Sequence, residues 1–199
     1  EKTYNNLGNL LNSLGKYDEA ISAYNKAVKI KPDYAEAYNN LGTVMQKLYN
    51  FDEAIINYKK ALKSKPNFAE ANNNLGYALR ELGNPEDSLT YIDKALEIKP
   101  NYAEAYNNKG SAYEALNRDD LALNSYQKAI KIKPDYAEVY NNIGMIYSDH
   151  AKFDEALSNY NKAINLKPNY EKTYNNLGNL LNDLGKYDEA TDAYRKAIK

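Results

Sequence analysis

Hydrophobic and polar residues follow a helical period along this chain. In the first 34 residues, positions 3, 4, 7, 8, 10, 11 and 14 fall on one arc when successive residues are placed about 100° apart. Further on, Ala20, Ile21, Tyr24, Ala27 and Val28 share a second arc. Small residues are interspersed with large ones on both arcs, which lets two helices approach closely. The pattern predicts two amphipathic helices, A and B, that pack against each other.

The same pattern returns every 34 residues. Glycine occupies position 8 of each block, at residues 8, 42, 76, 110, 144 and 178, and proline occupies position 32 at residues 32, 66, 100, 134 and 168. The blocks are residues 1–34, 35–68, 69–102, 103–136, 137–170 and a shorter 171–199. A fixed period of this length indicates one structural unit per block, each burying its apolar face against its neighbours. The sequence predicts a single array spanning residues 1–199.

The helix ends carry recognisable signals. Asp18 and Glu19 lie at the N-terminus of helix B, where the helix dipole favours anions, and Pro32 ends that helix. Asp33 is followed three residues later by Glu36, the spacing of a capping box. We therefore expect Asp33 to cap the next helix A.

The residues that recur in each block resemble the tetratricopeptide repeat. In the first block they are Tyr4, Leu7, Gly8, Leu11, Ala20, Tyr24, Ala27 and Pro32. This resemblance covers the whole chain. It implies an all-α fold, an α-solenoid of stacked helix–turn–helix hairpins forming a right-handed superhelix. Helix A would line its concave surface and helix B most of its convex surface. The resemblance also implies a scaffold for protein–protein interaction, although a fold by itself does not name a partner.

Asparagine fills two adjacent positions on the polar arc of helix A. Position 5 is Asn5, Asn39, Asn73, Asn107, Asn141 and Asn175, and position 6 is Asn6, Asn40, Asn74, Asn108, Asn142 and Asn176. An uncharged carboxamide has two N–H donors and an oxygen acceptor, so it can pair with both groups of a peptide backbone. We expect a ladder of these side chains to bind an extended peptide in the concave groove, mainly through position 6.

Two further observations bear on this asparagine ladder. The run Tyr-Asn-Asn-Leu is similar to the repeat region of O-linked N-acetylglucosamine transferases, where an asparagine ladder also occurs. The alternative is that one asparagine of each pair bonds to a neighbouring helix. Positions 9 and 12 on the same arc differ between blocks. Their residues, such as Tyr77 and Arg80 in the third block, are expected to set which ligand side chains are preferred. Glu36 and its equivalents at position 2 favour a slightly acidic groove, not a clamp for a terminal carboxylate.

Composition argues against other classes of function. Lys and Arg number 26 and Asp and Glu 27, giving a net charge of −1, so no overall positive field attracts nucleic acid or anionic lipid. No apolar run is long enough to span a membrane. Cysteine is absent, which fits an intracellular, cytoplasmic compartment. We find no motif of catalysis or of a cofactor or metal site. The one histidine, His150, stands where most blocks have leucine and is expected to pack at a helix end.

Several positions depart from the pattern. In the third block, Asn72 replaces the aromatic residue of position 4, Ser88 replaces alanine and Ile92 replaces tyrosine. These changes indicate either neutral drift or a locally soft hinge. Lys109 replaces an apolar residue and is expected to extend to solvent.

The two ends leave two alternative functions open. Residues 1–29 and 171–199 are nearly identical, which favours a self-assembling module that stacks end to end. The chain begins at Glu1, not at methionine, which predicts an excised or processed segment. It could therefore be the substrate-recognition part of a larger enzyme such as a glycosyltransferase.

Overall fold

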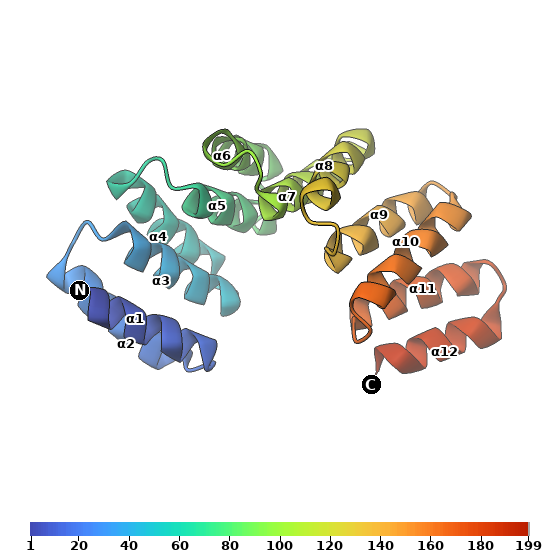
Figure 1. Ribbon diagram of the computed structural model, residues 1–199, viewed down its shortest axis with the longest axis horizontal. Coiled ribbons are helices and arrows are strands. Elements are labelled where there is room, and N and C mark those ends of the chain that lie inside the picture. The colour runs from blue at the N-terminus through green and yellow to red at the C-terminus, as the bar shows by residue number, and fades with distance from the viewer. Residues whose placement is uncertain (199) are drawn as a thin grey trace. The chain divides into compact units, whose positions relative to one another are not determined.

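The computed structural model describes residues 1–198, whose regular secondary structure consists of twelve α-helices (Figure 1). They are α1 (Lys2–Ser13), α2 (Tyr17–Ile30), α3 (Ala35–Lys47), α4 (Phe51–Ser64), α5 (Ala69–Glu81), α6 (Pro85–Ile98), α7 (Ala103–Glu114), α8 (Asp119–Ile132), α9 (Ala137–Asp149), α10 (Phe153–Leu166), α11 (Glu171–Asp183) and α12 (Tyr187–Ala197). Odd-numbered helices are the predicted A helices and even-numbered ones the B helices. The all-α fold of helical hairpins is confirmed.

The helices belong to two compact units. The first comprises residues 1–116 with α1 to α7, and the second begins at Asn117 and comprises α8 to α12. The boundary lies inside the fourth block, between its two helices. Whether the six blocks form one continuous array therefore stays a prediction, and each unit is described by itself.

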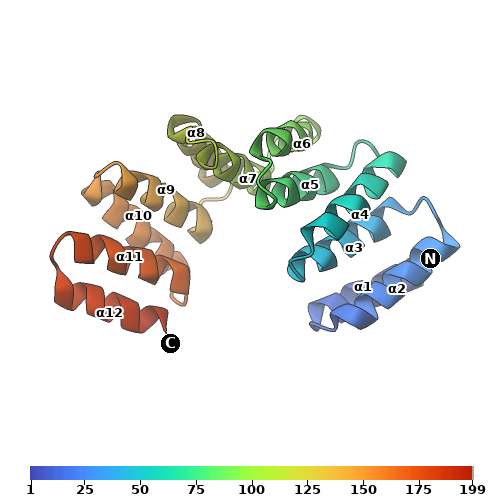
Figure 2. The same cartoon turned by 180° about the vertical axis from the view of Figure 1, so that it is seen from behind.

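Within each unit the hairpins stack in chain order (Figures 1 and 2). In the first unit, α1 pairs with α2, α3 with α4 and α5 with α6, and each B helix also packs on the A helix that follows it. The A helices α1, α3, α5 and α7 contact one another in succession. The second unit repeats this arrangement with α9 paired to α10 and α11 to α12. Consecutive A helices thus form a continuous row within a unit.

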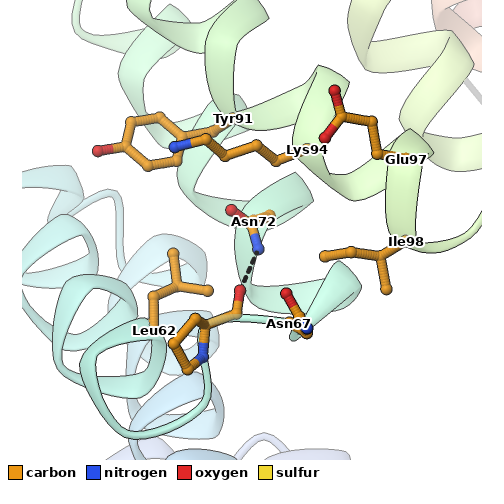
Figure 3. A pocket seen from close by; sticks show the side chains of 8 residues that line it. Leu62, Asn67, Asn72, Tyr91, Lys94, Glu97 and Ile98 are labelled. Atoms are coloured by element: carbon orange, nitrogen blue, oxygen red, sulfur yellow. Dashed lines mark hydrogen bonds between the residues drawn. The ribbon is translucent and has the colours of Figure 1, made fainter.

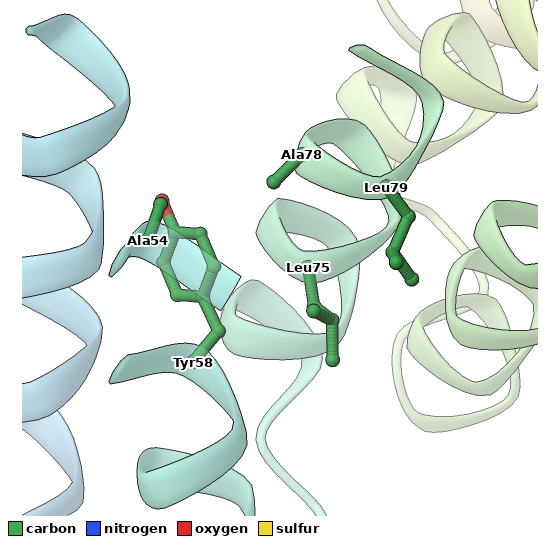
Figure 4. Close-up of a cluster of buried hydrophobic side chains, with 5 residues drawn as sticks. All are labelled: Ala54, Tyr58, Leu75, Ala78 and Leu79. Atoms are coloured by element: carbon green, nitrogen blue, oxygen red, sulfur yellow. The ribbon is translucent and has the colours of Figure 1, made fainter. Parts of the chain in front are cut away.

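Glycine at position 8 is required by the tyrosine of helix B. The rings of Tyr24 and Tyr58 are fully buried against Gly8 and Gly42. A Cβ atom added to either glycine would lie 2.5 Å from the ring Cε1 atom. The tyrosine then packs between its own hairpin and the next, as in the cluster of Ala54, Tyr58, Leu75, Ala78 and Leu79 (Figure 4). The 34-residue glycine period is therefore a packing requirement.

The predicted capping box is wrong. Helix α3 begins at Ala35 with Tyr34 as its N-cap residue, and no side chain caps it. Asp33 lies in a turn that the Tyr34 N–H closes by donating to the Lys31 carbonyl at 3.1 Å. This turn displaces Asp33 from the capping position. Glu36 binds Lys65 instead, with 2.8 Å between the two charged groups.

The turn from helix A to helix B contains one residue in the left-handed conformation in every block. These residues are Gly15, Tyr49, Gly83, Asn117, Ala151 and Gly185, with φ between 54° and 78°. Glycine adopts this conformation without a steric penalty, which explains its presence in three of the six turns. The turns therefore share one geometry despite their different residues.

Candidate functional site: the asparagine ladder

The two asparagines of each pair occupy different environments. At position 5, the side chains of Asn5, Asn39, Asn73, Asn107 and Asn141 are at most 9% exposed. At position 6, Asn40, Asn74, Asn108 and Asn176 are partly exposed, Asn6 is exposed and Asn142 is buried. The position-5 side chains therefore point toward the next A helix, whereas most position-6 side chains reach the surface of the A-helix row.

Hydrogen bonds join position 6 of one A helix to position 5 of the preceding one. The amide Nδ2 donates to the preceding Oδ1 from Asn40 to Asn5 at 3.0 Å, from Asn74 to Asn39 at 3.2 Å, from Asn108 to Asn73 at 2.9 Å and from Asn176 to Asn141 at 3.0 Å. Asn107 and Asn142 belong to different units. Position 5 thus has the role that the alternative interpretation described, a bond to a neighbouring helix, and we call each such bond a rung.

The rung between Asn74 and Asn39 orients the Asn74 side chain without using all its hydrogen-bonding capacity, whereas the Nδ2 of Asn40 donates to both Asn5 and Asn9. A carboxamide has two N–H donors and an oxygen with two lone pairs. In Asn74 one N–H is used by the rung, and Oδ1 lies 3.5 Å from the Nδ2 of Asn73, a long contact. A second N–H and an oxygen lone pair therefore remain at the surface. The rung holds them in one orientation, which lowers the entropy lost when a ligand binds.

Tyrosines of helix B also reach the polar arc of helix A. The hydroxyl of Tyr24 donates to Asn9 at 2.8 Å, that of Tyr58 to Gln46 at 3.0 Å and that of Tyr194 to Asn179 at 2.8 Å. Their rings pass beneath the glycine of position 8, so each hydroxyl emerges beside position 9 or 12. Sequence reasoning missed these partners because they come from the other helix. The signal was available, since tyrosine and glycine recur together.

Burial changes the ionisation of three tyrosines at position 24, namely Tyr24, Tyr58 and Tyr160. It raises the pKa of Tyr24 and Tyr160 to about 12, because the charged phenolate loses hydration. The same cause raises the pKa of Tyr58 still further. The hydroxyls therefore remain neutral donors at any ordinary pH.

Tyr77 and Arg80 lie together on α5. The Arg80 guanidinium lies 5.0 Å from the centre of the Tyr77 ring, a cation–π contact, and also pairs with Glu81. The Nε atom of Arg80 is buried without a hydrogen-bond partner. Tyr77 also contacts Phe51, with 6.3 Å between ring centres. The structure thus brings these two predicted residues into one cluster beside the ladder.

Two carboxylates of position 2, those of Glu36 and Glu70, are paired with lysines. Lys65 pairs with Glu36 at 2.8 Å and Lys99 with Glu70 at 3.5 Å, each pair joining the two ends of one block. The hydrogen bond from Lys65 holds the pKa of Glu36 below its ordinary value. Because both carboxylates have cationic partners, the expected acidic character of this face is reduced.

The lysine at position 26 has a structural partner as well. Its ammonium lies over the position-4 ring in four blocks, at 5.7 Å for Lys26 and Tyr4, 5.6 Å for Lys60 and Tyr38, 5.0 Å for Lys162 and Tyr140, and 5.7 Å for Lys196 and Tyr174. A cation–π contact of this kind stabilises a protein by about 0.5–1 kcal/mol at an exposed site. Lys109 was expected to extend to solvent, but its ammonium forms an ion pair with Asp93 at 2.6 Å.

His150 is not a packing residue, contrary to expectation. It is the C-terminal cap of α9, its side chain is 53% exposed, and its Nε2 lies 2.8 Å from Asp119. The position is peripheral even for leucine, since the equivalent Leu14 is 63% exposed. Residues 1–198 contain no group of three or more histidine, aspartate or glutamate side chains arranged to hold a metal ion. Nor does any helix in this range combine the length and apolar character needed to cross a membrane.

Comparisons with known proteins agree with this architecture. A TPR repeat profile matches residues 4–48 and 50–83, and tetratricopeptide repeat profiles match residues 67–135, 137–170 and 171–199. A comparison with curated protein sequences gave no match.

Among solved structures, MamA is 32% identical with a TM-score of 0.65, and the match covers 79% of this chain and 92% of MamA. YrrB, described as a TPR protein with an unusual peptide-binding site, is 28% identical with a TM-score of 0.64, covering 85% of this chain and 88% of YrrB. A thermophilic TPR protein of Thermus thermophilus is 27% identical with a TM-score of 0.76, covering 90% of this chain and 98% of that protein. This chain belongs to the tetratricopeptide repeat family.

Proposed function

We propose that this protein is an interaction scaffold that binds an extended peptide along its row of A helices. The observation that supports this most directly is the rung, which leaves position-6 carboxamides oriented at the surface. A peptide residue offers one N–H and one C=O, which match the remaining acceptor and donor of such a side chain. Tyr77 and Arg80, clustered on α5 beside the ladder, would favour particular ligand side chains. YrrB, a relative with a peptide-binding site, makes the same class of ligand reasonable here.

The two halves of a rung allow a matched test. Asn39→Ala and Asn74→Ala break the same hydrogen bond, but only the second removes the surface carboxamide. In the next rung, Asn73→Ala and Asn108→Ala likewise break one hydrogen bond, and only Asn108→Ala removes the surface carboxamide. We expect Asn74→Ala/Asn108→Ala to weaken peptide binding at least 10-fold, while Asn39→Ala/Asn73→Ala retains it. The measurement is fluorescence polarisation with a linear peptide selected on the wild-type protein from a random-sequence library.

The ligand can be varied in the same assay. N-methylation of single peptide bonds removes a backbone donor, whereas alanine substitution removes a side chain. A backbone-binding ladder should be more sensitive to methylation than to alanine at the same residue. Equal loss of binding in both double variants, at a temperature where circular dichroism shows both folded, would show that the rung matters only for stability.

A specific observation also favours end-to-end association as a second function. Leu7 and Leu10 on α1 are 45% and 57% exposed, yet their equivalents Leu41 and Val44 are buried against α2. The ladder has open ends as well, since Asn6 and Asn175 are both exposed. We infer that α1 of one copy packs on α12 of another, with Asn6 and Asn175 forming a further rung.

This association predicts a concentration-dependent mass. Multi-angle light scattering should show larger species as the wild-type concentration rises, and Leu7→Lys/Leu10→Lys should remain monomeric. Leu14→Lys is the matched control, because Leu14 is exposed and its interior equivalent Leu48 is 43% exposed too. A wild-type protein that stays monomeric at millimolar concentration would contradict the inference.

A further inference from the structure

The third hairpin, α5 and α6, lacks an aromatic ring that the other five blocks provide. Position 4 is Tyr4, Tyr38, Tyr106, Tyr140 and Tyr174 in those blocks and Asn72 in the third. In the fifth block the Tyr140 hydroxyl donates to the Pro134 carbonyl at 3.2 Å. The Lys162 ammonium lies 5.0 Å from the centre of that ring. The surroundings of this position therefore suit a phenol, with an acceptor at its hydroxyl and a cation at its face.

These surroundings remain in the third block although the ring is absent. Asn72 Nδ2 donates to the Pro66 carbonyl at 3.3 Å and to the Phe68 carbonyl at 3.0 Å. Pro66 is the equivalent of Pro134, so the shorter side chain satisfies the same acceptor from closer to the backbone. Lys94 is the equivalent of Lys162 and lies 5.2 Å from the centre of the Tyr91 ring. Position 4 of the third block therefore presents an amide side chain where the other blocks present a ring.

A pocket of about 410 Å³ occupies this place (Figure 3). Leu62, Pro66, Ile98 and the ring of Tyr91 form its apolar walls. Asn67, Asn72, Lys94 and Glu97 supply polar groups. This volume falls in the range of small-molecule sites, roughly 300–1,000 Å³.

Equivalent hollows occur in the second and sixth blocks, with volumes of about 540 and 390 Å³, so the third block is distinguished by its lining and not by its size. The hollow of the second block contains the Tyr38 ring, and Lys63 and Ser64 stand where the third block has Glu97 and Ile98. At the equivalent of Tyr91 the other blocks have only small or amide side chains, namely Ala23, Asn57, Ser125, Asn159 and Ala193. An aromatic wall and the absence of the position-4 ring therefore coincide only in the third block.

We propose that this pocket binds a phenolic ring, either of a small phenol or of a tyrosine side chain of a partner. The ring would lie between Leu62 and Ile98 and beside Tyr91, where edge-to-face contacts between aromatic rings are favourable. The Lys94 ammonium would interact with its face, and the phenol hydroxyl would donate to Glu97 or to the second lone pair of the Pro66 carbonyl. The site is independent of the asparagine ladder.

The test uses p-cresol as the probe of a small phenol and N-acetyl-tyrosinamide as the probe of a tyrosine side chain. Titration followed by amide chemical shifts should show saturable binding of at least one probe, with the affected amides between residues 62 and 98. N-acetyl-leucinamide, which lacks an aromatic ring, should not bind saturably. Binding of p-cresol alone would identify a small-molecule site, and binding of both probes would identify a site that also accepts a protein side chain.

Two variants test the location. Asn72→Tyr places the usual ring of position 4 in the pocket and should weaken probe binding at least 10-fold. Lys94→Gln removes the cation and should weaken it several-fold without filling the pocket. Ser13→Tyr adds a tyrosine at an exposed site on α1 and should leave binding unchanged. Absence of saturable binding to the wild type, or binding that Asn72→Tyr and Lys94→Gln leave unchanged, would overturn the proposal.

Discussion

Replacing Gly42 by alanine is expected to lower the free energy of unfolding by about 3 kcal/mol, the upper range for overpacking a core. The new Cβ would lie 2.5 Å from Cε1 and 2.7 Å from Cδ1 of Tyr58. The ring cannot easily retreat, because it is fully buried and its hydroxyl is bonded to Gln46. Alanine is the better helix former by about 1 kcal/mol, which is too little to offset the collision. Urea denaturation followed by circular dichroism measures the difference.

A double-mutant cycle isolates the cause of this effect. Tyr58→Ala removes the ring and should by itself cost about 3–5 kcal/mol. In that background Gly42→Ala should be neutral or stabilising, because its Cβ has room and its helix propensity is favourable. An equal cost of Gly42→Ala in both backgrounds would show that the close contact between glycine and tyrosine is not the reason for the period.

Stability should fall steeply as the pH rises above 10. Burial raises the pKa of Tyr24, Tyr102, Tyr160 and Tyr170 from 10.0 to about 12. A raised folded-state pKa means that folding favours the neutral phenol. This contribution to the free energy of unfolding is fully present below pH 10. It is lost as the pH rises toward 12, because the tyrosines ionise in the unfolded chain while those in the folded protein stay neutral. Each tyrosine contributes up to about 1.4 kcal/mol per pH unit in this window.

The measurement is the urea midpoint between pH 8 and pH 11.5. Lysines also lose their charge in this range, so a control is needed that changes only the phenols. Tyr24→Phe/Tyr160→Phe keeps both rings and removes two ionisable groups, so its midpoint should fall less steeply than that of the wild type. The variant should be less stable near neutral pH, because Tyr24 loses its bond to Asn9. Parallel curves for the two proteins would contradict the assignment to tyrosine.

Local helix signals predicted the hairpins well but not their detailed termini. Proline at fixed intervals marked the end of each helix B, because its fixed φ angle and missing N–H act without any distant contact. The capping box failed because sequence spacing does not reveal that a turn closes between Lys31 and Tyr34. Glu36 instead found Lys65, 29 residues away, and a wheel for a single helix cannot show such a pair.

The asparagine pairs illustrate the same division. Their recurrence identified the polar arc of helix A and raised both a ligand-binding and a structural role. Positions 5 and 6 are separated by only about 100° on the helix, so their chemistry and amphipathic pattern are almost the same. The structure distinguishes them, because the next A helix covers position 5 and leaves most position-6 side chains at the surface.

In the third block, sequence comparison marked Asn72 as irregular but could not show a pocket. Whether a missing ring leaves a cavity depends on how far the surroundings collapse. In the structure Asn72 donates to the Pro66 carbonyl, and Tyr91 lines the pocket beside it.

The sequence by itself determined the all-α hairpin fold, the family, the recurring pairs of asparagines and the small residues against which large side chains of the paired helix pack. These follow from period and residue type, which act locally and repeat in every block. Only the tertiary structure decided which asparagine is covered, which lysine neutralises which carboxylate, and which side chains line the pocket of the third hairpin. Those outcomes depend on distances between helices that are neighbours in space, and a distance of a few ångströms across an interface has no counterpart in the periodicity of a single chain.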